Sequence, residues 1–257
     1  MSRPPRFRGQ RHEAPRRASD IDTVVLYGWH PVREALSNPA RRIRRLVATE
    51  NGIRRLREDK VPIVIEPELV RPDAIDRLLT PDAVHQGLYV EADPLDAPTF
   101  GDLDGNDIVL VLDQVTDPHN VGAIIRSAAA FSIAAVITTE RHSPSATGVL
   151  AKSASGGLEH VPLVFVKNLG DTLEELGENG VLRIGLDSDG DADLAKTAIR
   201  GPLALVVGAE GKGLRQRTRQ LCDHLARLDM PGAIRSLNVS NATALALYIA
   251  RQSVPPA

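Results

Sequence analysis

Residues 230–248 read MPGAIRSLNVSNATALALY, and this stretch decides how the fold of the chain is interpreted. Four polar side chains crowd the start of its strongly apolar helical part: Ser236, Asn238, Ser240 and Asn241. A helix N-cap requires only one such residue. The surplus polar groups predict that this helix start hydrogen-bonds a ligand, because unpaired backbone N–H groups meet there.

Two upstream segments also place polar residues and glycines directly after apolar runs. They are LVLDQVTDPHNVGAIIRSA at residues 110–128 and LVVGAEGKGL at residues 205–214. The apolar runs do not alternate with polar residues, which is typical of parallel strands covered on both faces. Ligands bind outside the carboxyl ends of such strands, so we expect the chemistry in the loops that follow LVLD, LVVG and ARLD.

Arg126 is the residue of the first segment that turn formation leaves unexplained. Pro118, Asn120 and Gly122 can build a turn and start a helix, with Asn120 as its N-cap. Arg126 follows in an otherwise apolar helix, about one turn further on. We expect its side chain to point back toward the strand ends.

Glu210 of the second segment is surrounded by Gly208, Gly211 and Gly213, and glycines let a backbone approach a ligand closely. The pattern matches neither a Walker loop, which needs GxxxxGK followed by Ser or Thr, nor a dinucleotide fingerprint. An ordinary nucleotide-binding enzyme would require such a phosphate loop. This alternative therefore has no motif to support it.

The order of apolar runs and breakers predicts two α/β domains. Strands at VVLYG, IRRLVAT and VPIVIE, with helices at HPVREAL and GIRRLRE, indicate a small domain over residues 21–93 that closes with VHQGLYVEAD. Residues 94–105, PLDAPTFGDLDG, supply the breakers of a linker. Residues 106–257 alternate apolar strands with helices to the end, which predicts a mostly parallel sheet. Residues 1–20 combine Arg, Pro and Gly, so we expect a basic arm that is disordered when free.

Composition and charge narrow the class of protein. Cys222 is the lone cysteine, so it forms no internal disulfide. No run approaches the ~20 apolar residues of a membrane span, and no secretory signal is evident. We therefore expect a cytoplasmic protein. Aromatic residues make up 3% of the chain, so its core must be aliphatic. The net charge is -2, yet arginines concentrate in the first sixty residues, which indicates a polyanionic partner.

Three motifs carry a resemblance to the SpoU (TrmH) family of the SPOUT methyltransferase class. NVGAIIRSA, VVGAEGKGL and MPGAIRSLNVSNATALALY resemble its three motifs in order and approximate spacing. YGWHPVREAL and VHQGLYVEA look like the opening and closing of its small, ribosomal-protein-like RNA-binding domain, and KSASGGLEHVP is also similar to family sequence. The opening of the small domain resembles the branch that methylates guanosine in large-subunit (23S) rRNA. A tRNA ribose methyltransferase is the alternative within the family.

The resemblance implies a reaction, a cofactor and an architecture. It implies transfer of a methyl group from S-adenosylmethionine to a ribose 2′-hydroxyl of structured RNA, without a metal, by a homodimer whose catalytic domain holds a deep trefoil knot. Arg126 would be the catalytic arginine, as a base or as an electrostatic stabiliser. The matching positions that would orient Arg126, the ribose and the cofactor are Asn120, Glu210, Ser236 and Asn238, and those that would hold the cofactor are Gly208, Leu228, Met230, Gly232 and Leu237. Asp229 departs from the family, in which Pro often precedes the Met.

The small domain and the basic arm are expected to select the RNA. Phosphate contacts are predicted for Arg41, Arg42, Arg44 and Arg45, because the chain has few aromatic residues for base stacking. Two of the four could instead only solvate the edge of a strand. A non-catalytic RNA-binding assembly factor is an alternative from another class, and the presence of all five predicted catalytic residues argues against it.

Overall fold

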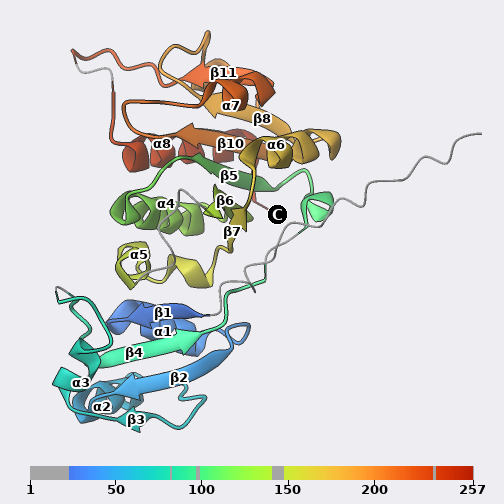
Figure 1. The fold of residues 1–257 in the computed structure, drawn as a ribbon. Helices are drawn as coiled ribbons and strands as arrows, with labels where there is room; N and C mark the ends of the chain where they lie inside the picture. Colours follow the sequence, from blue (N-terminus) through green and yellow to red (C-terminus); the bar gives the residue numbers. More distant parts are fainter. Residues whose placement is uncertain (1–22, 82, 97–98, 141–147, 234–235, 257) are drawn as a thin grey trace, which may run out of the picture.

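The computed structural model describes residues 23–81, 83–96, 99–140, 148–233 and 236–256. The basic arm predicted for residues 1–20 lies outside the described residues. None of the described helices is long and apolar enough to cross a membrane. Two sheets organise the described chain, one within residues 24–92, here called the small unit, and one within residues 108–253, here called the large unit (Figure 1).

The small unit contains a four-stranded sheet in the order β1-β4-β2-β3. Helices α1 and α2 pack on one face against Leu26, Leu46 and Val90, whereas Ile75 of α3 packs against Val47 on the other. The elements are β1 (Val24–Tyr27), α1 (Trp29–Ser37), β2 (Ile43–Ala48), α2 (Glu50–Glu58), β3 (Glu68–Leu69), α3 (Pro72–Asp76) and β4 (Leu88–Ala92).

The strand predicted at VPIVIE, residues 61–66, is wrong. These residues have no strand pairing, and β3 begins only at Glu68 and is two residues long. Pro62 and Pro67 bracket the apolar residues, and proline cannot donate a hydrogen bond to a sheet ladder. The segment therefore runs beside the sheet as an extended loop.

The large unit contains a seven-stranded parallel sheet in the order β7-β6-β5-β10-β8-β11-β9, as the apolar runs predict. Its strands are β5 (Ile108–Asp113), β6 (Ala135–Thr139), β7 (Leu163–Val166), β8 (Leu182–Leu186), β9 (Ala192–Asp193), β10 (Leu203–Gly208) and β11 (His224–Arg227). Its helices are α4 (Pro118–Ala130), α5 (Gly148–Ala154), α6 (Leu169–Glu178), α7 (Gln216–Leu221) and α8 (Val239–Ser253), with single 3-10 turns η4 (Gly157–Glu159) and η5 (Leu194–Lys196).

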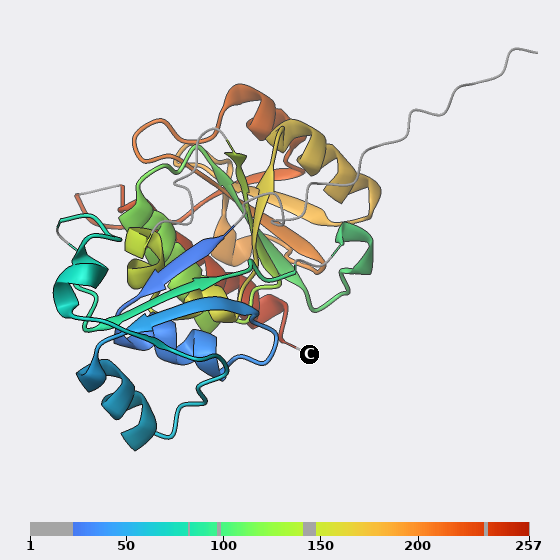
Figure 2. The ribbon, with the colours of Figure 1, turned by 60° about the horizontal axis from the view of Figure 1, so that its bottom comes forward.

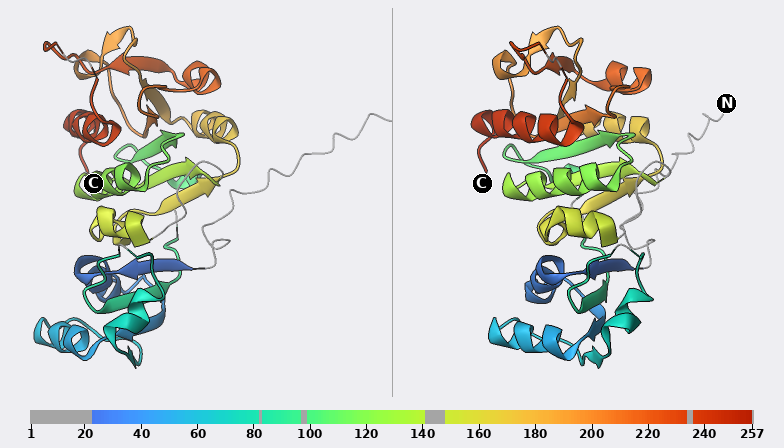
Figure 3. Two further views of the ribbon diagram at one scale, coloured as in Figure 1. Left: turned by 60° about the vertical axis from the view of Figure 1, so that its left-hand side comes forward. Right: turned by 90° about the vertical axis from the view of Figure 1, so that its left-hand side faces the viewer.

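Both faces of the large sheet are covered by helices. Leu110 and Leu112 of β5 face the cluster that includes α4 and α8, whereas Val109 and Val111 face the cluster that includes α6. Figure 3 shows α8, α4 and α5 on one side of the sheet. This double cover explains why the strands are apolar at every position rather than at alternate ones.

The two units share one apolar cluster. Leu26 and Val32 of the small unit belong to the same cluster of buried side chains as Ile124 and Leu150 of the large unit. Helix α5 packs against both β1 and α4, so it lies between the two sheets (Figures 1 and 2). The predicted linker is partly structured, because Phe100 of the 3-10 turn η2 (Phe100–Asp102) is buried among large-unit side chains.

Gly122 provides a test of the packing between α4 and α5. A Cβ on Gly122 would lie 2.3 Å from the Cβ of Ser153 and 2.8 Å from the carbonyl oxygen of Leu150. Such overpacking costs about 1–3 kcal/mol. We expect Gly122→Ala to lower the melting temperature in calorimetry by several degrees. Gly105→Ala is the control, because its Cβ would meet nothing within 4 Å, and equal melting temperatures for the two variants would contradict this close packing of α4 on α5.

Candidate active site

The carboxyl ends of four neighbouring strands form the edge on which the predicted loops lie. Gly208 at the end of β10 is paired in register with Asp113 at the end of β5, and Leu186 of β8 pairs with both Val207 and Ala226. The loop after β5 leads to α4 on one face, whereas the loop after the adjacent β10 leads to α7 on the other. A crevice at such a switch point is where α/β sheets bind ligands.

Asn238 joins the three predicted loops. It is the N-cap of α8, and its Oδ1 accepts hydrogen bonds from the backbone N of Ser240 at 2.9 Å and from the Ser240 hydroxyl at 2.6 Å. Its Nδ2 donates to Oδ1 of Asn120 at 3.0 Å and to Oε2 of Glu210 at 3.3 Å. These contacts bring together the stretches around residues 120, 210 and 236, which were predicted to converge, and they do so through Asn238.

The alternative interpretation, in which Asn120 is the N-cap of α4, is wrong. Asp117 is the N-cap, its carboxylate accepts from the backbone N of His119 at 3.0 Å, and Pro118 occupies the first helical position. Asn120 lies within the first turn instead. Because Asp117 performs the capping, the Asn120 side chain is available to Asn238.

Arg126 lies on α4, six residues beyond Asn120, which corresponds to a rise of roughly 9 Å along the helix. Its side chain is exposed, and within the described part of the chain it forms no hydrogen bond or ion pair. Asn120, which was expected to help orient Arg126, accepts a hydrogen bond from Asn238. Among the described residues, no carboxylate therefore neutralises the Arg126 charge.

Asp113 is a site residue to which the sequence reasoning assigned no role. It is fully buried, and its carboxylate accepts hydrogen bonds from the backbone N of Arg215 at 2.9 Å and from Nε of Arg215 at 2.6 Å. These bonds hold the far end of the loop that carries Glu210 against the end of β5. The signal that could have revealed Asp113 is a charged residue that ends a fully apolar run.

Gly208 and Gly213 close the base of the same loop. A Cβ on Gly208 would lie 2.2 Å from the carbonyl carbon of Gly213, which no side chain could tolerate, and Gly213 has a φ of 64°. The backbone N of Gly213 donates to the carbonyl oxygen of Ala209 at 2.9 Å. The glycines at these two positions therefore serve backbone contact within the loop.

The loop after β11 is suited to a ligand with an apolar body and polar edges. Leu228, Met230 and Leu237 are half-buried, and a Cβ on Gly232 would meet nothing within 4 Å. Neither Met230 nor Gly232 forms a backbone–backbone hydrogen bond with another described residue. Ser236 is exposed. Ile234 and Arg235 lie outside the described residues.

The four arginines predicted to contact phosphate differ in availability. The phosphate contact predicted for Arg41 is wrong. The Arg41 side chain is 2% exposed and hydrogen-bonded to Glu159, so it cannot reach RNA. Arg44 pairs with Asp93. Arg45 forms two 2.8 Å hydrogen bonds to Glu68, which raise the pKa of Arg45 and lower the pKa of Glu68. Arg42 is the most exposed of the four, at 84%, and its Nε lies 3.8 Å from Oδ2 of Asp93.

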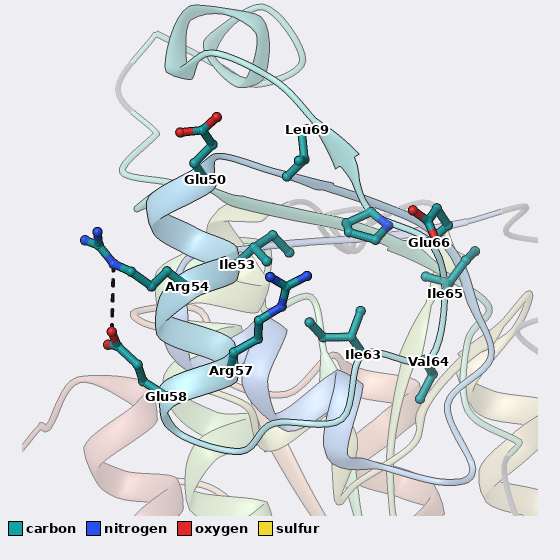
Figure 4. A pocket seen from close by; sticks show the side chains of 11 residues that line it. Glu50, Ile53, Arg54, Arg57, Glu58, Ile63, Val64, Ile65, Glu66 and Leu69 are labelled. Atoms are coloured by element: carbon teal, nitrogen blue, oxygen red, sulfur yellow. Dashed lines mark ion pairs between the residues drawn. The ribbon is translucent and has the colours of Figure 1, made fainter.

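A groove of about 740 Å³ lies on the small unit, between α2 and residues 63–69 (Figure 4). Its apolar lining comes from Ile53, Ile63, Val64, Ile65, Pro67 and Leu69, and its charged lining from Glu50, Arg54, Arg57, Glu58 and Glu66. None of the predicted site residues lines it. The groove is therefore separate from the carboxyl edge of the large sheet.

Cys222 is an unreactive thiol in this structure. Burial raises the pKa of the Cys222 thiol to about 12, so the thiol is protonated and weakly nucleophilic near neutral pH. No group of three or more His, Cys, Asp or Glu residues that could hold a metal ion was found in the described ranges.

Comparison with known proteins gives a consistent result for both units. The family model described as "SpoU rRNA Methylase family" matches residues 107–248, and the model described as "RNA 2'-O ribose methyltransferase substrate binding" matches residues 25–98. Proteins named 23S rRNA (guanosine-2'-O-)-methyltransferase RlmB are similar to this chain. The one from Ralstonia nicotianae is 38% identical over 91% of this chain and 98% of its own length, and the one from Pseudomonas putida is 35% identical over 87% and 94%.

The fold is also found in a solved structure. The SpoU methyltransferase AviRb from Streptomyces viridochromogenes, solved in complex with AdoMet, superposes with a TM-score of 0.78 over 93% of each chain, at 24% identity. At that identity the likeness concerns the fold alone. The match of the family model to more than half of the chain, together with the sequence relatives, shows that this protein belongs to the SpoU rRNA methylase family.

Proposed function

We propose that this protein transfers a methyl group from S-adenosylmethionine to the ribose 2′-hydroxyl of a guanosine in large-subunit rRNA, in the cytoplasm. The observation that carries the proposal is the contact of Asn238 with both Asn120 and Glu210, which gathers three family motifs at one strand edge. The names of the relatives support rRNA guanosine as the substrate. In this proposal residues 21–93 bind RNA, residues 94–105 connect the domains, and residues 106–257 perform the transfer.

The cofactor would be held by the loops after β10 and β11. Half-buried Leu228, Met230 and Leu237 offer apolar surface to an adenine ring, and the backbone groups of Met230 and Gly232, which bond to no other described backbone group, can bond its polar edge. Gly208 keeps the neighbouring backbone close. When bound, S-adenosylmethionine supplies an electrophilic methyl group on a sulfonium.

Arg126 would act on the ribose through its charge. A 2′-hydroxyl is a poor nucleophile at neutral pH. As the new carbon–oxygen bond forms and the carbon–sulfur bond breaks, the hydroxyl proton would pass to solvent water. A guanidinium holds its protons too firmly to serve as a base, so Arg126 is assigned to stabilise negative charge on the 2′-oxygen. Its lack of an ion pair with any described residue supports this role, because a paired arginine would have to exchange partners first. Asn120, Glu210, Ser236 and Asn238 would position the ribose and the cofactor around it.

A homodimer and a knotted chain path are part of the proposal. Leu245 and Tyr248 of α8 are 50% and 55% exposed, and apolar surface of this kind supports a protein contact at α8. A symmetric pair would bring a second copy of this face to the site. After β11 the chain returns past β8 to place α8 against β10 and α4. That return path supports the proposed knot.

The substrate assignment is tested by offering different RNAs. The protein is incubated with labelled S-adenosylmethionine and with rRNA and tRNA prepared separately, and 2′-O-methyl sites are then mapped. We expect label on large-subunit rRNA at a guanosine, because the sequence relatives carry that activity in their names. Label on tRNA alone would replace the proposed substrate. Cofactor binding without transfer to either RNA would instead indicate an assembly factor.

The role of Arg126 is tested by Arg126→Ala. We expect transfer to fall by at least about 10²-fold, the typical cost of removing an electrostatic stabiliser, with S-adenosylmethionine affinity in calorimetric titration nearly unchanged. Arg200→Ala is the control, since Arg200 is also exposed but precedes the opposite end of β10. A large loss of cofactor binding in Arg126→Ala would overturn the assigned role.

The bridging role of Asn238 is tested by Asn238→Asp. The carboxylate retains an oxygen to cap α8. It replaces the NH2 group that bonds to Asn120 and Glu210 with a negatively charged group beside the Glu210 carboxylate. A hydrogen bond to a charged group contributes roughly 1.5–3 kcal/mol, so we expect a melting temperature lowered by several degrees and, below it, a tenfold to hundredfold lower transfer rate. The matched control is Asn168→Asp at the N-cap of α6. Wild-type rates for Asn238→Asp would mean that the bridge is dispensable.

A further inference from the structure

Arg41 of the small unit is buried against the large unit by a set of directed bonds. Its Nε donates to Oε2 of Glu159 at 2.8 Å, and its Nη2 donates to Oε1 of Glu159 at 2.9 Å and to the carbonyl oxygen of Leu158 at 2.9 Å. Its Nη1 donates to the carbonyl oxygen of Asp93 at 2.5 Å. The side chains of Arg41 and Glu159 are 2% and 1% exposed.

A second small-unit side chain reaches the same turn. Nδ2 of Asn38 donates to the backbone oxygen of Glu159 at 3.0 Å and to its Oε2 at 3.2 Å. The backbone oxygen and both carboxylate oxygens of Glu159 therefore all accept hydrogen bonds from the loop between α1 and β2. The turn η4, which carries Glu159, is thus fixed by the small unit.

The turn η4 also lies directly against the backbone of α4, the helix that carries Arg126. A Cβ on Gly157 would lie 3.1 Å from the carbonyl oxygen of Ile125, 3.2 Å from Cα of Arg126 and 3.3 Å from the backbone N of Arg126. Gly157 and Glu159 belong to the same three-residue turn. The chain of contacts therefore runs from Arg41 through Glu159 and Gly157 to Arg126.

We propose that Arg41 and Glu159 are positioning residues that fix the small unit, and the RNA bound to it, in register with Arg126. This inference rests on the proposed function. A buried ion pair is weak evidence for a stabilising role, because its desolvation offsets much of its attraction. What the planar guanidinium provides is a single geometry with four acceptors, which an apolar contact between the units would not impose.

The register matters because methyl transfer depends on the placement of one ribose. A displacement of about 1 Å between reacting groups can cost on the order of 10²-fold in rate. A small unit that shifts on the large unit would still bind RNA and cofactor. It would present the wrong ribose, or the right one out of line, to Arg126.

The test is the double variant Arg41→Met with Glu159→Met, which removes both buried charges and leaves neither one unpaired. Steady-state transfer to rRNA is measured with mapping of the methylated positions, together with the melting temperature and S-adenosylmethionine affinity. We expect an RNA KM within about twofold of wild type, a kcat lowered roughly tenfold or more, and methylation spread to neighbouring riboses. Arg41→Lys keeps the charge but not the four-acceptor geometry, and we expect an intermediate kcat.

The matched control is Arg183→Met with Asp223→Met, which removes a two-bond Arg–Asp pair within the large unit, with contacts of 2.7 and 3.1 Å. It should leave kcat and the methylated position unchanged. Wild-type kcat and product position in the Arg41→Met/Glu159→Met protein, or in Arg41→Lys should the double variant not fold, would overturn the inference. Absence of transfer by the unchanged protein would overturn the proposed function, and this inference with it.

Discussion

The candidate site depends on the orientation of one carboxamide. The Asn238 oxygen is engaged at the start of α8, so its NH2 group must face the other way, toward Asn120 and Glu210. An amide carries one acceptor and two donors at opposite edges, and here all are used. The same side chain therefore begins the last helix and ties it to the loops that follow β5 and β10.

The remaining structure serves to bring those loops within reach of Asn238. The parallel pairing of β5, β10, β8 and β11 places their carboxyl ends at one edge, and Asp113 holds the Glu210 loop there through Arg215. The small unit approaches from the α4 side of the sheet and contacts the turn that supports Arg126. The proposed RNA-binding unit and the proposed catalytic arginine are therefore linked through one turn, although they lie in units with different sheets.

The sequence predicted the strands and the converging residues because both leave local signals. Unbroken apolar runs identified β5 and β10, and surplus polar groups identified Asn238. The strand prediction for VPIVIE was wrong because its apolar residues resemble a strand, whereas its prolines prevent strand pairing. The interpretations of Asn120 and Arg41 failed for another reason. Asp117 caps α4 in place of Asn120, and Glu159, which lies 118 positions from Arg41 in the sequence, binds the Arg41 side chain. Such competition is decided by tertiary contacts that no local pattern contains.

A crystal structure of the protein with S-adenosylmethionine and a guanosine-containing rRNA fragment would test the convergence of the three loops on the reacting groups. We expect the cofactor to occupy the loops after β10 and β11. The ribose 2′-oxygen should face its methyl group beside Asn238, within reach of an Arg126 guanidinium from the same protomer or its partner. A cofactor bound elsewhere, or a methyl group with no Arg126 near it, would contradict the account.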